Sequence, residues 1–203
     1  MENKSFPATE YMNIEALLSW VQRNYPEINP ESQDYSTLVL LLEEKRRMGY
    51  SYESAEASFI LLVRKFFGGL PNFFELESYK VIDQLVHGEK SVIATLKISF
   101  KNTVKLVAAE GNGPVNALDN ALREALIDFY PMLHNVHLQD YKVHSLESSD
   151  GTGARVRVLI TSGDGAAQWT TIGVSTDIIK ASWEALESSI VYKLDANYTS
   201  SQC

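Results

Sequence analysis

The sequence has almost no cysteine, no long apolar run and no excess of positive charge. Its one cysteine among 203 residues is Cys203, which excludes a disulfide framework and argues against a buried catalytic thiol. The longest apolar stretches, such as Leu38–Leu42 and Phe59–Val63, are far shorter than the ~20 residues that a membrane span needs. No basic start with an apolar core and cleavage site is present, so we expect a cytoplasmic protein without a secretory signal.

The charge balance excludes two classes of partner. The net charge is −8 and the pI is near 5.0. Residues 1–75 carry seven basic and eleven acidic side chains and the remainder carries eleven and fifteen, so neither part is a basic arm. The densest basic group, Lys45–Arg47, directly follows Glu43 and Glu44 and indicates a solvated helix face of mixed sign. Nucleic acid and anionic membrane are therefore not expected as partners.

The residue types that carry catalysis are not grouped. His134, His137 and His144 form a loose cluster that no cysteine or paired carboxylate completes as a metal set. No nucleophile elbow, triad order or convincing acid–base pair of carboxylates is present. The sequence therefore predicts no catalytic residue, no metal site and no cofactor in this chain.

Helical periodicity dominates the first 70 residues. Three segments with apolar residues at helical spacing are expected before Pro71, the second of them capped by Ser36 and ended by Gly49. After Pro71 short β-rich segments alternate with two helical patterns, which indicates an α+β chain. The expected organisation is a disordered start or cloning remnant at 1–12, a helical linker subdomain at 13–71, a second domain at 72–196 and a frayed tail at 197–203.

An internal repeat organises the second domain. Residues 77–81 (ESYKV) resemble residues 139–143 (QDYKV) at an offset of 62, and the glycines and the helices that follow them repeat at an offset of 60. Each copy reads as three strands and a helix, so we expect a pseudo-symmetric layered domain of two βββα repeats. The expected strands are Phe73–Leu85, Ser91–Phe100, Lys105–Ala109, Val136–Leu146, Gly153–Thr161 and Gln168–Val174. The expected helices are Pro114–Tyr130 and Thr176–Lys193.

Each repeat has a strand-to-helix turn made of small residues. In Gly111–Pro114 the proline suits the first helical turn, and the amides that follow it would attract an anion. A plain tight turn explains the same residues. In Gly173–Asp177 a serine or threonine could cap the helix, which is equally a purely structural role. Two helix starts in related positions would suit one small carboxylate better than a nucleotide.

Four sequence blocks, in order, resemble the C-terminal regulatory domain of the 2-isopropylmalate synthase and citramalate synthase family, the LeuA-type allosteric dimerisation domain. They are residues 111–122 (GNGPVNALDNAL), 140–143 (DYKV), 151–158 (GTGARVRV) and 171–183 (TIGVSTDIIKASW). Upstream, residues 48–59 (MGYSYESAEASF) resemble the helical linker of the citramalate-type branch. The similarity covers about residues 14–194.

The resemblance implies a regulatory rather than a catalytic role. Family members begin with a TIM barrel that condenses acetyl-CoA with a 2-oxo acid on a divalent metal, and this chain contains no such barrel. It is therefore expected to be inactive alone, to form a homodimer and to bind a branched-chain amino acid as feedback inhibitor at the dimer interface. The citramalate-like linker favours isoleucine, with leucine as the alternative. A small stand-alone enzyme and a dimerisation module without ligand are the other hypotheses.

The resemblance also implies an effector site made from three segments. The first turn would hold the carboxylate, one strand face would flank the side chain and the second turn would close the site; Asn116 or an acidic neighbour would answer the ammonium group. The candidate effector-binding residues are Gly111, Asn112, Gly113, Pro114, Val115, Asn116, Ala117, Leu138, Tyr141, Ser145, Gly173, Val174, Ser175 and Thr176. Ser145 stands where an apolar residue would be expected.

Overall fold

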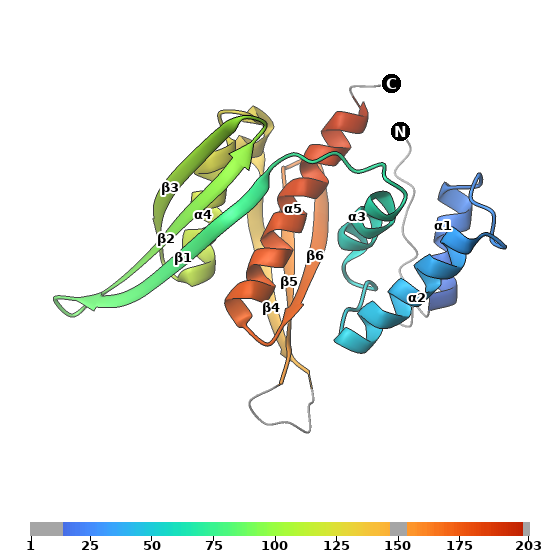
Figure 1. The fold of residues 1–203 in the computed structure, drawn as a ribbon. Helices are drawn as coiled ribbons and strands as arrows, with labels where there is room; N and C mark the ends of the chain where they lie inside the picture. The colour runs from blue at the N-terminus through green and yellow to red at the C-terminus, as the bar shows by residue number, and fades with distance from the viewer. Residues whose placement is uncertain (1–13, 147–153, 201–203) are drawn as a thin grey trace.

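The computed structural model describes residues 14–146 and 154–200 (Figure 1). The expected start at 1–12, the residues 151–153 that begin one block of the resemblance and the last residues of the expected tail, 201–203, lie outside the described residues. The described chain contains a group of three helices followed by two units of three strands and one helix. The α+β class and the two βββα repeats are thus confirmed.

The first three helices are α1 (Ile14–Asn24), α2 (Gln33–Met48) and α3 (Glu56–Phe66). The cap of α2 differs from the prediction: Ser32 Oγ accepts a hydrogen bond from the Tyr35 amide at 3.2 Å, and Ser36 lies one turn inside the helix. Either serine can cap a helix, but capping at Ser32 allows a longer helix than capping at Ser36. Gly49 ends α2 with φ +104°, a left-handed conformation that favours glycine.

The two repeats form two separate antiparallel sheets. The first unit is β1 (Glu75–Val86), β2 (Glu89–Phe100), β3 (Thr103–Gly111) and α4 (Pro114–Leu126), and after the 3₁₀ helix η1 (Pro131–Asn135) the second is β4 (His137–Ser145), β5 (Val156–Gly163), β6 (Gln168–Ser175) and α5 (Ile178–Ser200). The strand orders are β1-β2-β3 and β4-β5-β6. The first strands of both units are irregular at the same place, between Leu76 and Ser78 and between Leu138 and Asp140. This offset of 62 residues matches the sequence repeat.

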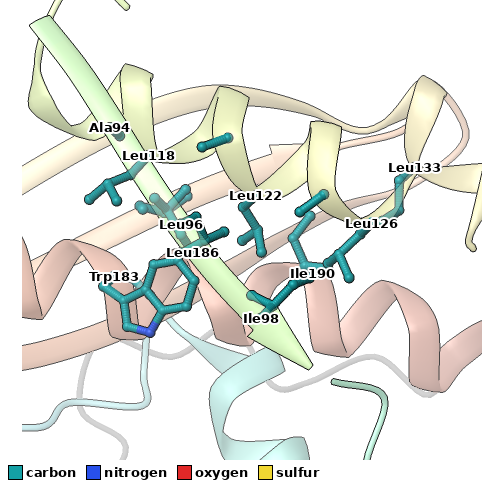
Figure 2. Close-up of a cluster of buried hydrophobic side chains, with 14 of the residues drawn as sticks. Ala94, Leu96, Ile98, Leu118, Leu122, Leu126, Leu133, Trp183, Leu186 and Ile190 are labelled. Atoms are coloured by element: carbon teal, nitrogen blue, oxygen red, sulfur yellow. The ribbon is translucent and has the colours of Figure 1, made fainter. Parts of the chain in front are cut away.

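One hydrophobic core joins the two units. Alternate residues of β2 point inward, where α4 covers the first sheet, and α5 covers the second sheet in the same way. Figure 2 shows side chains of α4, α5 and β2 meeting between the sheets. The labelled members are Ala94, Leu96, Ile98, Leu118, Leu122, Leu126, Leu133, Trp183, Leu186 and Ile190. Each unit alone would expose apolar side chains of its helix and sheet to water. Because these side chains are buried against the other unit, the two repeats stabilise each other.

The three N-terminal helices pack on the second unit. Leu159 of β5 and Ile172 and Val174 of β6 point away from α5 and join a second core with α1, α2 and α3. In Figure 1, α3 lies beside β6 and α1 and α2 extend outward from it. The second sheet is therefore covered on both faces, while the outer face of the first sheet carries exposed Val104 and Leu106.

The end of the chain differs from the expected frayed tail. Helix α5 continues to Ser200, and the hydroxyl groups of Thr199 and Ser200 donate to carbonyl oxygens one turn back. Asp195, close to this end, pairs with Arg64 of α3 at 2.7 Å. The ion pair and the aromatic contact of Tyr198 with Phe73 keep the last turns helical. Residues 197–200 thus belong to the helix.

Strong acid is expected to weaken the connection between β5 and α5. Asp164 follows β5, where its Oδ2 pairs with Lys193 Nζ at 2.5 Å and its Oδ1 accepts the amides of Ala166 and Ala167. These contacts, the lysine hydrogen bond above all, lower the pKa of Asp164 to about 2. Because the folded pKa lies below the unfolded one, the stabilisation is present above about pH 4 and is lost as the pH falls through about 2.

Thermal unfolding of the native chain and of Asp164→Asn between about pH 5 and 2 checks this expectation. The native chain should lose more stability than the variant over this interval. Asp83→Asn is the matched control, because Asp83 forms a more exposed pair with Lys90 at 3.5 Å. Equal acid sensitivity of Asp164→Asn and the native chain would contradict the role of Asp164.

Candidate functional site

A pocket of about 490 Å³ lies between α4 and the beginning of β4. The N-terminal turns of α4 supply one wall, and the first residues of β4 supply the other. The lining residues are Val115, Asn116, Asp119, Asn120, Arg123, His137, Leu138 and Tyr141. The structure thus brings four of the sequence-predicted residues, Val115, Asn116, Leu138 and Tyr141, around one hollow.

The start of α4 is open to a ligand. Gly113 stands at the N-cap position in an extended conformation, and no side chain of the described residues caps the helix there. The amides of Val115 and Asn116 lie in the first turn, where a helix offers them no internal partner. The Asn116 side chain turns back and accepts the Asn112 amide at 3.1 Å. The first turn of α4 therefore presents donor groups and the positive end of the helix dipole beside the pocket.

A partly buried ion pair also lines the pocket. Asp119 Oδ2 accepts a hydrogen bond from Arg123 Nε at 2.9 Å, and the side chains are 9% and 17% exposed. Arg123 Nη1 also donates to the carbonyl oxygen of Val136, which holds the guanidinium group in place. A carboxylate accepts at two oxygens, so Asp119 can receive a further donor besides Arg123. The pocket therefore combines a site for a negative group with a site for a positive one.

Sequence analysis missed Asp119 and Arg123. An acidic and a basic residue four positions apart on a helix usually form a surface pair, so their spacing alone does not point to a binding site. The signal was Leu118 and Leu122, which place their neighbours Asp119 and Arg123 at the border of the buried stripe. A charged pair at the edge of a buried helix face becomes partly buried when another element packs over it.

Tyr141 connects the pocket to α5. Its ring lines the pocket beside Leu138, and its hydroxyl group lies 2.9 Å from Ser182 Oγ. Ser182 is fully buried in the second turn of α5. The ring therefore has a fixed orientation, with an apolar face available to a ligand.

The second predicted turn does not join this pocket. Asp177 Oδ1 accepts the amides of Ile179 and Lys180 at 2.7 and 3.3 Å, so the start of α5 is capped by its own carboxylate. Ser175 Oγ accepts the Asp177 amide, and Thr176 is exposed. Val174 packs against the N-terminal helices. A capped helix start with a negative charge repels an anion, which supports the purely structural reading of Gly173–Asp177.

The glycines that end β3 and β6 serve helix packing. A Cβ atom on Gly111 would lie 2.3 Å from the Ala117 nitrogen, and one on Gly173 would lie 2.0 Å from the Ala181 oxygen. Both glycines thus let a strand pack closely against the backbone of the following helix. The space that they leave is filled by this helix and not by a ligand. Gly113, by contrast, has open space around its Cβ position.

The remaining predicted residues lie around the pocket or away from it. Gly111 and Asn112 line a neighbouring hollow of about 530 Å³, which Asn116 also borders. Pro114 begins α4 and Ala117 is fully buried beneath the turn. Ser145 is exposed at the far end of β4, four residues and therefore about 13 Å beyond Tyr141. The structure does not bring Ser145 into the pocket.

The described residues include no group of three or more His, Cys, Asp or Glu side chains that could hold a metal ion. Among the same residues, no helix has both the length and the apolar character that crossing a membrane requires.

The family model for the LeuA allosteric (dimerisation) domain matches residues 53–194, from the segment before α3 into the last turns of α5. The chain belongs to this family. The resemblance found in the sequence is thereby confirmed. The match to the LeuA domain includes α3 as well as both βββα units, in agreement with the packing of α3 on β6 and α5.

Several curated relatives of this LeuA domain chain are named (R)-citramalate synthase. The chain is 44% identical over 174 residues to the protein of Aquifex aeolicus and 46% identical over 171 residues to that of Geobacter sulfurreducens. These alignments cover 83% and 82% of this chain and 32% of each relative. The relative from Sulfolobus acidocaldarius is 31% identical over 192 residues, 95% of this chain and 35% of its own length. The chain thus spans about a third of the length of the curated relatives it matches.

Proposed function

We propose that this chain is the amino-acid-sensing regulatory region of a citramalate-synthase-like enzyme and that the α4–β4 pocket binds isoleucine as feedback inhibitor. The observation that carries the proposal is the combination, within one pocket, of an uncapped helix start, the buried carboxylate of Asp119 and the apolar side chains of Val115 and Leu138. The names of the relatives support the choice of enzyme.

An α-amino acid matches these groups one by one. Its carboxylate would accept hydrogen bonds from the amides of Val115 and Asn116, where the helix dipole favours negative charge. Its ammonium group would donate to Asp119, about one helical turn deeper. Its branched side chain would lie between Leu138 and the ring of Tyr141. Leucine is the alternative effector, because moving one methyl group changes the binding free energy by only roughly 1–3 kcal/mol.

The same proposal includes a homodimer formed through residues 73–194, with the effector at the interface. The outer face of the first sheet supports it: Ile82, Val104 and Leu106 share that face and are 36%, 54% and 68% exposed. The equivalent face of the second sheet is covered by the N-terminal helices. Light scattering at micromolar concentration is expected to give twice the mass of 22.8 kDa, and a monomer would contradict this arrangement.

Catalysis belongs to a different part of the parent enzyme in this proposal. Condensation of acetyl-CoA with a 2-oxo acid needs converging polar ligands for a divalent metal, which we assign to a catalytic barrel outside these 203 residues. The chain by itself should release no coenzyme A from acetyl-CoA and pyruvate. A cytoplasmic location stays a prediction.

Tyr141→Ala is expected to weaken isoleucine binding at least about tenfold, because an aromatic wall that contacts the ligand contributes about 1.4 kcal/mol or more. Calorimetric titration of the native chain and the variant measures the change. Tyr79→Ala is the matched control, since Tyr79 occupies the same repeat position but stacks on Trp183, with ring centroids 5.8 Å apart. Unchanged affinity in Tyr141→Ala would show that Tyr141 is only a core residue.

A further inference from the structure

Two hydrogen bonds on different sides of α5 connect the pocket with the N-terminal helices. On one side, Ser182 Oγ donates its proton to the Ile178 carbonyl oxygen at 2.7 Å. A serine hydroxyl has a single proton, so the Tyr141 hydroxyl must be the donor in the 2.9 Å contact with Ser182. The wall of the pocket is therefore bonded directly to the second turn of α5.

On the other side, Glu184 of α5 contacts the segment between α2 and α3. Its Oε2 accepts the Tyr50 hydroxyl at 3.1 Å and the Val174 amide at 3.2 Å. Ser182 and Glu184 are two residues apart, which places them roughly 200° apart around the helix. A rotation or shift of the start of α5 that changes one contact must therefore change the other.

The other polar contacts of the N-terminal helices reach parts of the second unit that a shift of the start of α5 would not move. Arg157 Nε of β5 donates to the Gly49 carbonyl oxygen at 2.7 Å, and the Ile172 amide of β6 donates to Ser58 Oγ at 3.0 Å. These two contacts reach strands, and Arg155, directly before β5, donates to the Met48 carbonyl oxygen at 3.3 Å. The ion pair between Arg64 and Asp195 reaches α5, but near its opposite end. Among the contacts of the described residues, the Tyr50–Glu184 hydrogen bond thus joins these helices to the beginning of α5.

The surroundings of this link leave room for movement. Tyr50 and Glu184 both border a cavity of about 660 Å³ between α3, α5 and the segment that leads into β1. Lys45 lies over the Tyr50 ring at 4.5 Å from its centroid, so the ring is supported on its other side. A displaced Tyr50 hydroxyl can enter the cavity without pushing aside a packed core side chain.

We propose that the Tyr50–Glu184 hydrogen bond couples the α4–β4 pocket to the N-terminal helices, with Tyr141 and Ser182 as the connection at the pocket. A ligand that changes the position of Tyr141 changes the start of α5 and, through Glu184, the docking of the segment around Tyr50. Tyr50 and Glu184 are positioning residues and contact no ligand. The identity of the ligand rests on the proposed function, whereas the coupling itself follows from the contacts of the chain.

Amide hydrogen exchange of residues 49–63 tests the coupling without a ligand. Tyr141→Phe removes the hydroxyl group at the pocket and should accelerate exchange of these amides about threefold or more in the native background. In the Tyr50→Phe background the same substitution should have less than about half of that effect. Tyr52→Phe is the matched control, because the Tyr52 ring stacks on that of Tyr50, with centroids 6.1 Å apart, but forms no hydrogen bond to α5 within the described residues. It should preserve the full effect of Tyr141→Phe.

Equal acceleration in the native and Tyr50→Phe backgrounds, or no acceleration in either, would overturn the proposal. A second arm adds saturating isoleucine, which should alter exchange of residues 49–63 in the native chain and leave it unchanged in Tyr50→Phe. If neither isoleucine nor leucine binds the native chain, the proposed function fails while the comparison of variants still decides the coupling. If isoleucine binds and the effects of the two substitutions simply add, the coupling fails and the proposed function stands.

Discussion

Asp119→Asn is expected to weaken isoleucine binding by about 100-fold or more. The substitution removes the negative charge that would receive the ammonium group, and it leaves Arg123 beside it with an unbalanced positive charge. Because Asp119 is 6% exposed, water cannot replace the lost partner at full strength. Titration calorimetry on the variant measures the loss, and circular dichroism establishes that the variant is folded.

A control variant separates the pocket charge from the net charge of the chain. Asp128→Asn also removes one negative charge near the end of α4, but Asp128 has a 72% exposed side chain that pairs with Lys105 outside the pocket. It should bind isoleucine with unchanged affinity. An affinity of folded Asp119→Asn within about threefold of the native value would show that Asp119 does not receive the ligand.

Gly173→Ala is expected to have the largest effect on stability, a loss of about 3 kcal/mol in the free energy of unfolding. The new Cβ atom would lie 2.0 Å from the Ala181 carbonyl oxygen, which belongs to helix backbone and cannot rotate away. Either β6 or α5 must move, although both contribute to the shared core. Chemical denaturation of the native and variant chains measures the difference.

Gly69→Ala is the control for this second prediction. Its Cβ atom would be 3.7 Å from the Arg64 carbonyl oxygen, an ordinary contact distance, so its stability should stay within about 0.5 kcal/mol of the native value. A folded Gly173→Ala as stable as Gly69→Ala would mean that the strand and the helix separate at little cost. The close approach would then contribute little to the packing of the second unit.

The fold could be predicted well where one physical pattern dominates. The alternation of Val92, Ala94, Leu96 and Ile98 with polar neighbours indicated a strand with one wet face, and these four side chains are buried in β2. The repeat at an offset of 62 indicated two equal units, since matching turns and strands in one chain usually reflect one motif used twice. How the units share a core could not be predicted, because that depends on contacts between residues far apart in the sequence.

The boundaries of helices were harder to predict. Ser32 and Ser36 are both suitable caps, and the choice between them depends on where the preceding loop leaves the chain. The last turns of α5 looked polar and frayed, yet the pair of Asp195 with Arg64 holds them against α3. Long-range contacts of this kind leave no local signal.

The sequence grouped four residues that the structure places around one pocket, and their role in binding stays a prediction. Val115, Asn116, Leu138 and Tyr141 line one pocket, as the resemblance implied for parts of a single site. Asp119 and Arg123 could not be distinguished from a surface pair until β4 was seen to cover them. The two turns looked equivalent in the sequence, but only Gly173–Asp177 contains a carboxylate, that of Asp177, which caps the helix that follows.

Calorimetric titration of the native chain with isoleucine, leucine and alanine tests the central claim most directly. The proposed pocket predicts one isoleucine bound per chain, leucine bound about tenfold more weakly and no binding of alanine, which lacks the branched side chain. Heat of binding from neither isoleucine nor leucine at millimolar concentration would contradict the claim and leave a dimerisation module without a ligand.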